Sequence, residues 1–187
     1  MPSPGTVVKV GGSLFDWPDL KSRLADFLST LANKNVLLVP GGGKTADAVR
    51  AYDGTHGLGE EASHWLALQA LSLNARFLQT LLPTAPLVAT LAGASGSEIC
   101  ILDPFPFFQA DELRSDPLPH DWQVTSDSLT VRVAKLAEAR ELILLKSADW
   151  HGSDWNGASI VDGYFAEALR SVPTMRVRVV NLRQFQH

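Results

Sequence analysis

The chain has 187 residues, of which 45% are hydrophobic and 19% are charged, a composition typical of a folded globular protein. This length is enough for one α/β domain with a substantial core and short for two. The formal net charge of −4 argues against a general nucleic-acid-binding protein, which needs a basic surface to neutralise phosphates.

The first half of the chain alternates strands, glycine turns and helices. Residues 6–10 are a short β-branched strand that leads into glycines, and a helix is expected over 17–33. Residues 35–39 are a continuously apolar strand of the kind that is buried on both faces of a parallel sheet, and this strand also ends in glycines. With a further helix over 45–52 and a loop over 53–59, the order indicates βαβ units.

The second half continues this pattern. The longest helical pattern covers 60–82, and its apolar stripe is expected in the core or in a homodimer interface. The other expected elements are strands over 87–91, 99–102, 142–145 and 175–181, helices over 126–139 and 163–171, and a proline-interrupted surface stretch over 104–119. We therefore predict one domain over 1–187, a three-layer αβα sandwich with a mainly parallel central sheet.

Nothing in the sequence indicates export or a membrane. The single cysteine, Cys100, excludes an internal disulfide, and the apolar runs are no longer than a strand. The first five residues have neither the charge nor the apolar core of a signal peptide. We expect a cytoplasmic protein that binds no membrane and no nucleic acid.

Glycine clusters follow two strands of the predicted sheet: Gly11 and Gly12 after the first, and residues 41–43 after the second. Open α/β sheets bind ligands at the carboxyl ends of their strands, so both clusters are expected at the binding edge. Glycine lets a phosphate approach the backbone, and the helix that follows offers free N–H groups and the positive end of its dipole. With Lys9 two residues before Gly11, these turns indicate a polyphosphate site.

Two common phosphate-binding motifs fail on spacing. A P-loop needs a glycine five residues before the glycine of its Gly-Lys-Thr end, and the position five residues before Gly43 is Leu38. The dinucleotide fingerprint needs Gly-x-Gly-x-x-Gly, whereas Gly12 is followed by Ser-Leu-Phe-Asp.

The sequence resembles the amino-acid kinase family, which includes aspartate, N-acetylglutamate, uridylate and isopentenyl phosphate kinases. Three segments carry the resemblance, in the family's order: Val-Lys-Val-Gly-Gly-Ser at 8–13, Leu-Val-Pro-Gly-Gly-Gly at 38–43, and Thr-Ser-Asp-Ser at 125–128 with the strand and turn over 142–149. The resemblance covers most of the fold and implies a kinase that transfers a phosphoryl group from ATP to a small anionic molecule.

The resemblance also implies roles for single residues. Lys9 would neutralise charge on the transferred phosphoryl group, Asp127 would hold this lysine in place, and Lys146 is a candidate second catalytic cation. Nucleotide phosphates are expected at Gly11, Gly12, Ser13, Ser147 and Asp149, and the acceptor at Gly41, Gly42, Gly43, Lys44, Asp47 and Arg50.

Further expectations concern the acceptor end of the site. Asp47 and Arg50 are three residues apart, so they share a helix face. We expect Arg50 or Lys44 to bind an acceptor phosphate, and Asp47 or Asp53 to bind an ammonium group. A phosphate or carboxylate acceptor is ionised near neutral pH and needs no general base. Mg²⁺ is expected on the ATP phosphates, with no metal site of the protein's own.

Within the family, the short chain is most similar to the kinases of methanopterin-cofactor synthesis, whose acceptor is (5-(aminomethyl)furan-3-yl)methyl phosphate. This similarity rests on chain length and on residues 56–65, 121–128 and 179–183. A nucleoside monophosphate, isopentenyl phosphate or an amino-acid carboxylate remain alternative acceptors.

The nucleotide half departs from the family pattern. The usual Asp-Val-Asp-Gly-Tyr turn is replaced by Ser-Ala-Asp-Trp-His-Gly at 147–152, and no later Gly-Gly-Met-Lys-type segment follows. These departures keep open a regulatory protein that binds a nucleotide without turnover, or an unrelated anion-binding domain. In structural terms alone, Lys9 can be a solvated lysine and Asp127 a stabiliser of a helix start. The rings of Trp150 and Trp155 can either stack on adenine or pack in the fold.

Overall fold

A single sheet organises the computed structural model, which describes residues 4–32, 35–152 and 154–186. Within these residues six strands pair in the order β3-β4-β2-β1-β5-β6, and all pairs are parallel. The strands are β1 (Thr6–Val10), β2 (Val36–Pro40), β3 (Leu87–Val88), β4 (Ile99–Leu102), β5 (Glu141–Lys146) and β6 (Arg176–Asn181).

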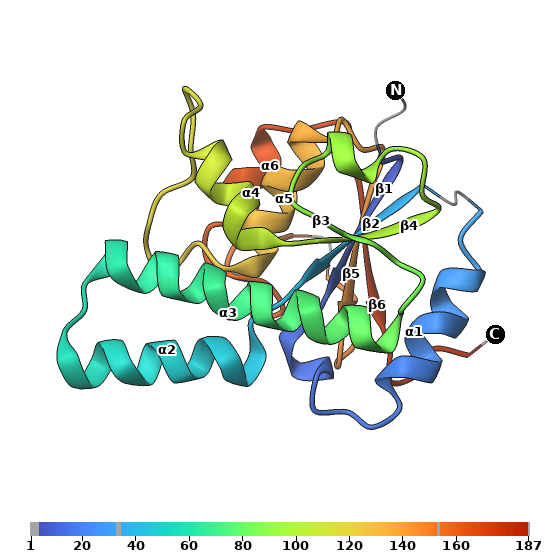
Figure 1. Cartoon of the computed structure of the whole chain (residues 1–187), viewed down its shortest axis with the longest axis horizontal. Coiled ribbons are helices and arrows are strands. Elements are labelled where there is room, and N and C mark those ends of the chain that lie inside the picture. Colours follow the sequence, from blue (N-terminus) through green and yellow to red (C-terminus); the bar gives the residue numbers. More distant parts are fainter. Residues whose placement is uncertain (1–3, 33–34, 153, 187) are drawn as a thin grey trace.

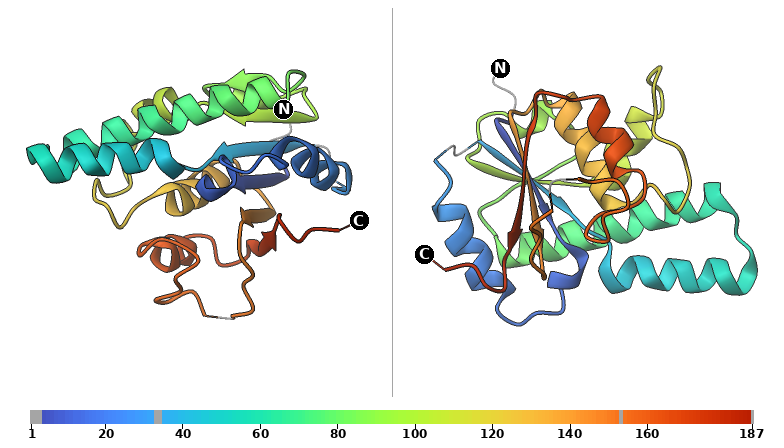
Figure 2. Two further views of the ribbon diagram at one scale, coloured as in Figure 1. Left: turned by 90° about the horizontal axis from the view of Figure 1, so that it is seen from below. Right: turned by 180° about the vertical axis from the view of Figure 1, so that it is seen from behind.

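Helices lie on both faces of the sheet (Figures 1 and 2). They are α1 (Leu20–Ser29), α2 (Gly43–His56), α3 (Glu60–Leu81), α4 (Pro104–Asp111), α5 (Ser126–Leu136) and α6 (Phe165–Arg170), with short 3-10 turns η1 (Gly12–Leu14) and η2 (Ala92–Ala94). This arrangement confirms the predicted α/β sandwich. None of the described helices is long and apolar enough to cross a membrane.

The central strands β1 and β2 are buried along their whole length. Successive side chains of a strand point to opposite faces, so β1 contributes to two cores. Val7 packs in the core that contains Phe165, and Val8 packs in the core that contains Phe27. The apolar stripe of α3 also belongs to these cores, because Leu68, Leu71, Ala75 and Leu78 are all buried there.

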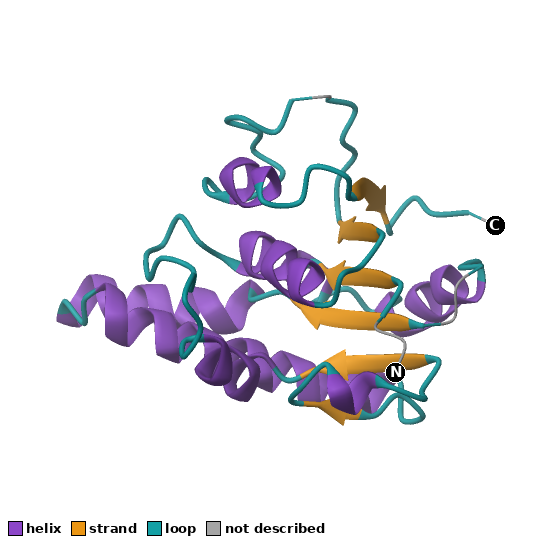
Figure 3. Cartoon of the chain, turned by 90° about the horizontal axis from the view of Figure 1, so that it is seen from above, coloured by secondary structure: helices purple, strands orange, loops and turns teal. Residues whose placement is uncertain are grey.

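Helices α2 and α3 form an antiparallel pair that extends beyond the carboxyl ends of the central strands (Figures 1 and 3). The sequence predicts a loop over 53–59, but α2 continues to His56. The helix ends there because Gly57 adopts a left-handed conformation, with φ of +62°, and its N–H bonds to the Asp53 carbonyl. Only three residues then separate the two helices, which keeps them side by side.

The prolines of the stretch over 104–119 predict a surface segment, but part of this stretch forms a helix that packs in the core. Helix α4 begins at Pro104, the position in a helix where a missing N–H is tolerated. The side chains of Phe107 and Phe108 are buried in the core. Two other expectations are too long: the helix predicted over 17–33 runs from Leu20 to Ser29, and the strand predicted over 87–91 has two residues.

The two glycine turns touch each other at the carboxyl edge of the sheet. A Cβ atom on Gly12 would lie 2.2 Å from the backbone nitrogen of Gly43, and one on Gly43 would lie 2.5 Å from the carbonyl oxygen of Gly12. Gly43 also has a φ of +54°, in the left-handed region that favours glycine. Backbone therefore meets backbone, and this contact places the start of α2 against η1.

We expect Gly12→Ala to lower the free energy of unfolding by about 3 kcal/mol, because the added methyl group meets rigid backbone. Gly54→Ala is the matched control, since nothing lies within 4 Å of the added atom and alanine favours the helical conformation of α2. Urea unfolding of the two variants measures the difference. Equal midpoints would contradict the contact between the turns.

Candidate active site

A buried carboxylate lies between two lysines at the carboxyl edge of the sheet. The Oδ1 atom of Asp127 is 2.9 Å from Lys9 Nζ and 2.8 Å from Lys146 Nζ, and its Oδ2 atom is 2.9 Å from Lys146 Nζ. The three residues are only 4–8% exposed. Lys9 is thus not a solvated lysine. The adjacent strands β1 and β5 supply the lysines, and the first turn of α5 supplies the carboxylate.

The charges in this cluster shift the pKa values of its members. Burial raises the pKa of Asp127, but the charges of Lys9 and Lys146 outweigh burial, and the pKa lies below its ordinary value. Burial, reinforced by repulsion from Lys9, lowers the pKa of Lys146 to about 8. With two ammonium groups and one carboxylate the cluster has a net positive charge near neutral pH. A buried positive charge of this kind suits an anionic ligand.

Asp162 fixes the beginning of α5 and thereby positions Asp127. Its carboxylate accepts hydrogen bonds from the backbone N–H groups of Thr125 and Ser128, both at 3.0 Å. The hydroxyl groups of the same two residues also donate to it. These bonds satisfy N–H groups at the start of the helix that have no partner within it. No sequence motif points to Asp162, because it lies more than 30 residues away in an irregular loop, where Asp-Gly indicates only a turn.

Some glycines of the two turns use their N–H groups in strand pairing, and the others line the cavity. Gly11 and Gly41 do not present free N–H groups, contrary to the sequence-based expectation. Their N–H groups donate to the carbonyls of Leu145 and Val10 respectively, each at 2.8 Å, and so extend the pairing of the strands. The glycines that line the adjacent cavity are Gly12, Gly42 and Gly43.

Asn74 holds the second glycine turn from α3. Its side-chain nitrogen lies 2.8 Å from the Gly41 carbonyl oxygen, 2.7 Å from that of Gly42 and 2.8 Å from Thr45 Oγ1. The residue is buried, so these bonds satisfy backbone carbonyls that water does not reach. An asparagine next to the apolar stripe of α3 signals a buried polar contact, but the sequence alone does not name the partner.

A cavity of about 450 Å³ lies between η1, the α2–α3 pair and residues 121–129. Its lining contains most of the residues expected at the acceptor, namely Gly42, Gly43, Lys44, Asp47 and Arg50. Apolar side chains also line it, among them Leu68, Leu71, Val124 and Leu129. The lining does not include Lys9, Asp127 or Lys146 themselves, but it includes Gly12, three residues beyond Lys9, and Ser126, next to Asp127.

Ion pairs tie the cations of the cavity to neighbouring carboxylates. Arg50 is 2.8 Å from Asp47, as their spacing on the helix predicts, and its guanidinium also lies 4.8 Å from the ring centre of Trp122. Lys44 is 3.1 Å from Asp16. Asp53, in contrast, does not line the cavity, and its carboxylate accepts hydrogen bonds from the Trp122 indole and the Gly59 N–H.

Only some of the residues expected around the nucleotide lie next to one another in the structure. Ser13 and Ser147 lie side by side, with 2.8 Å between their hydroxyl oxygens, whereas Asp149 is exposed to solvent two residues further on. The rings of Trp150 and Trp155 stack on each other with 5.7 Å between their centres, and Trp155 also packs on Phe165. Within the described part of the chain, no group of three or more histidine, cysteine or acidic residues could hold a metal ion.

Comparison with protein-family models gives a match to the Amino acid kinase family over residues 5–149. The chain belongs to the amino acid kinase family. As a member of this kinase family it is a phosphotransferase, and the family implies the use of ATP. The alternative of an unrelated anion-binding domain is therefore wrong.

Individual relatives support this assignment. The amino acid kinase is 26% identical over 185 residues to the [5-(aminomethyl)furan-3-yl]methyl phosphate kinase of Methanocaldococcus jannaschii, a match that covers 96% of this chain and 83% of that protein. Its fold is similar to that of the uridylate kinase of Archaeoglobus fulgidus, with a TM-score of 0.64, 18% identity and coverage of 94% and 90% of the two chains. The UMP kinase of Bacillus anthracis gives a TM-score of 0.65 at 12% identity and covers 98% and 89%.

We expect Asn74→Ala to lower the free energy of unfolding by about 1–3 kcal/mol, because it leaves buried carbonyl groups without partners. Gln69→Ala is the control, an exposed position on the same helix where little change is expected. Chemical unfolding of both variants provides the measurement. A loss no larger than that of the control would contradict the role of Asn74 in holding the turn.

We expect kcat/KM of the kinase to fall about tenfold per pH unit above pH 8, as Lys146 loses its proton and the cluster loses a positive charge. Loss of folding does not explain such a fall. Between about 8 and the ordinary value of 10.5 the unfolded chain binds more protons than the folded one at Lys146, so this residue makes the fold more stable as pH rises.

The variant Lys146→Arg tests whether the fall in kcat/KM comes from loss of the Lys146 proton or from loss of a proton by the acceptor. Arginine keeps its charge throughout this range, so the fall near pH 8 should disappear from the profile of the variant. A wild-type profile that stays flat up to pH 10, or an unchanged fall in the variant, would show that Lys146 is not the titrating group.

Proposed function

We propose that this kinase transfers the γ-phosphoryl group of ATP to [5-(aminomethyl)furan-3-yl]methyl phosphate and produces the diphosphate. The observation that carries the proposal is the mixed cavity beside the Lys9–Asp127–Lys146 cluster, whose lining combines Gly12, Gly42 and Gly43 with apolar side chains. The relative from Methanocaldococcus jannaschii, which matches almost the whole chain, is named for this acceptor.

The cavity fits an acceptor of this size and chemistry. A volume of about 450 Å³ is in the usual range of small-molecule sites. Leu68, Leu71 and Leu129 offer an apolar surface for a ring, and the N–H groups at the start of α2, with Lys44 beside them, offer donors for a phosphate. An elongated molecule with a phosphate at one end and a ring in the middle matches this distribution.

In the proposed reaction, an oxygen of the acceptor phosphate forms a bond to the γ-phosphorus of ATP. The bond between that phosphorus and the oxygen bridging to the β-phosphate breaks, and ADP leaves with the electron pair. The acceptor oxygen is already ionised, so no proton has to be removed. Catalysis then depends on positioning and on charge stabilisation, because phosphoryl transfer passes through a loose transition state.

The residues of the chain supply this stabilisation. Lys9 and Lys146 neutralise charge on the transferred group, and Asp127 holds both ammonium groups at one point. The N–H groups of Gly12 and of Gly42 and Gly43 bind phosphates on either side of it. Mg²⁺ would enter on the phosphates of ATP, where it usually binds in kinases.

ADP release in a coupled assay tests the proposal with a panel of acceptors: the furan phosphate, UMP, isopentenyl phosphate, aspartate and glutamate. We expect turnover of the furan phosphate with the highest kcat/KM. Lys9→Ala and Asp127→Asn should each lower kcat by about 100- to 1000-fold, because each removes charge organisation needed in the transition state. Lys21→Ala, an exposed lysine on α1, is the control and should keep full activity.

A higher kcat/KM for another member of the panel would replace the proposed acceptor but leave the kinase site intact. Binding of a non-hydrolysable ATP analogue with no turnover of any acceptor would favour the regulatory alternative. Full activity of the Lys9 and Asp127 variants would contradict the location of the site itself.

A further inference from the structure

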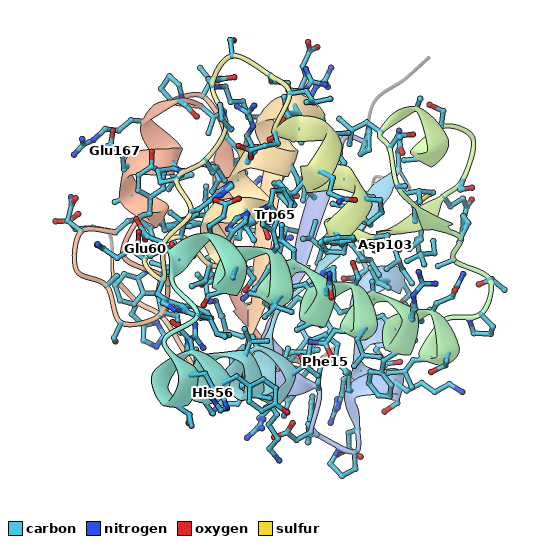
Figure 4. All side chains as sticks on the ribbon, turned by 60° about the vertical axis from the view of Figure 1, so that its left-hand side comes forward. Phe15, His56, Glu60, Trp65, Asp103 and Glu167 are labelled. Atoms are coloured by element: carbon cyan, nitrogen blue, oxygen red, sulfur yellow. The ribbon has the colours of Figure 1, made fainter. Side chains whose placement is uncertain are left out.

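The end of the cavity furthest from the transfer centre lies between α2 and the first turns of α3. Leu71 is next to the second glycine turn, since a Cβ on Gly42 would touch it at 3.4 Å. His64 is seven residues earlier on the same helix, and at 1.5 Å per residue it lies about 10 Å from that level. Glu60, one turn further, is the first residue of α3, where Figure 4 labels it, and follows the end of α2 after three residues.

Glu60 and His64 are four residues apart, so they share a helix face, and both line the cavity. They differ from the other polar groups there. Lys44 is paired with Asp16 and Arg50 with Asp47, whereas the structure records no ion pair or hydrogen bond for Glu60 among the residues it describes. Glu60 is therefore available to a ligand.

Asp121 adds a further carboxylate at this end of the cavity. Its Oδ1 atom accepts hydrogen bonds from the N–H groups of Gln123 and Val124, which fixes the carboxylate in a turn. Three carboxylates, those of Asp47, Glu60 and Asp121, thus line the cavity together with the single guanidinium of Arg50, which is paired with Asp47. The far end of the cavity has an excess of negative charge that favours a cation.

His64 is held as a neutral ring in this environment. It stacks on His120, with 3.9 Å between ring centres, and His120 is fixed by Glu61 at 2.5 Å and by Glu112 at 3.1 Å. Burial, and then the positive charge of His120, lower the pKa of His64 to about 4. Within the described residues neither ring nitrogen of His64 has a hydrogen-bond partner, so a nitrogen is free to accept a hydrogen bond.

We propose that Glu60 and His64 form a recognition site for a primary ammonium group at the far end of the acceptor. The carboxylate supplies the countercharge, and the neutral imidazole accepts one N–H. The inference rests on the proposed function, because it assigns the aminomethyl end of the same acceptor. It replaces the two carboxylates expected from the sequence as partners of that ammonium, because Asp47 is paired with Arg50 and Asp53 is bonded to the Trp122 indole outside the cavity lining.

The spacing along α3 matches the acceptor. The levels of the second glycine turn and of His64 differ by about 10 Å along the axis of α3, which is comparable with the length of the proposed acceptor from its phosphate to its amine. The apolar walls lie between these two ends. The arrangement selects an acceptor by its amine as well as by its phosphate.

The test compares two ligands that differ only in the amine: [5-(aminomethyl)furan-3-yl]methyl phosphate and the analogue with methyl in place of aminomethyl. Calorimetry without ATP gives their dissociation constants, and the coupled assay gives KM and kcat. We expect the wild type to bind the amine about 10- to 100-fold more tightly. Glu60→Gln and His64→Phe should each lower this preference about tenfold through Kd and KM, with binding of the methyl analogue unchanged.

The variants are chosen to isolate the ammonium contact. Phenylalanine keeps the ring that stacks on His120 but has no nitrogen, and glutamine keeps the shape of Glu60 without its charge. Glu167→Gln is the matched control, a glutamate in the first turn of α6 that is not in the lining of the cavity, and it should keep the wild-type preference.

The outcomes separate this inference from the proposed function. Binding that prefers the amine and depends on Glu60 and His64 supports the ammonium site even where neither ligand is turned over, a result that would count only against the proposed reaction. Equal binding of the two ligands by the wild type, including failure to bind either, overturns the inference. So does a variant that weakens both ligands equally or keeps the full preference.

Discussion

The ion pairs of Asp127 with Lys9 and Lys146 are the interaction on which the rest of the site depends. A buried carboxylate or a buried ammonium is costly without a partner, and removal of one member of a buried pair leaves an uncompensated charge. Here the lysines come from neighbouring strands and the carboxylate from a helix start that Asp162 fixes. The register of β1 with β5 and the position of α5 are thereby linked to the chemistry.

The contact between Gly12 and Gly43 links this cluster to the acceptor side. Because the two turns meet backbone to backbone, the start of α2 cannot shift without moving η1, which follows the strand of Lys9. Asn74 fastens the same turn to α3. The cavity walls formed by the α2–α3 pair are therefore placed relative to the lysines by short, rigid contacts rather than by long loops, as positioning within a fraction of an ångström requires.

The site residues that stand in short sequence motifs could be predicted, whereas those that act through contacts with distant parts of the chain could not. Lys9, the glycine turns and Asp127 stand in short motifs at strand ends or a helix start, and the structure brings them to one edge of the sheet. Asp162 and Asn74 act on segments far away in the chain, so no local pattern reveals their partners. The prediction that the N–H groups of Gly11 and Gly41 bind phosphates is wrong for the same reason, because these groups donate to carbonyls on neighbouring strands. Pro104 indicated a surface stretch because a proline at a helix start has the same local signal as one in a loop.

The position of Lys146 bears on the departure of this chain from the family pattern in its nucleotide half. A second cation at the end of β5 needs no later segment, because pairing with β1 already brings it to Asp127. Each ammonium group has three N–H donors, and Asp127 occupies only some of them, so both lysines keep donors for phosphate oxygens. One shared carboxylate can thus orient two cations without neutralising them. That balance suits a reaction in which negative charge is redistributed and no proton is removed.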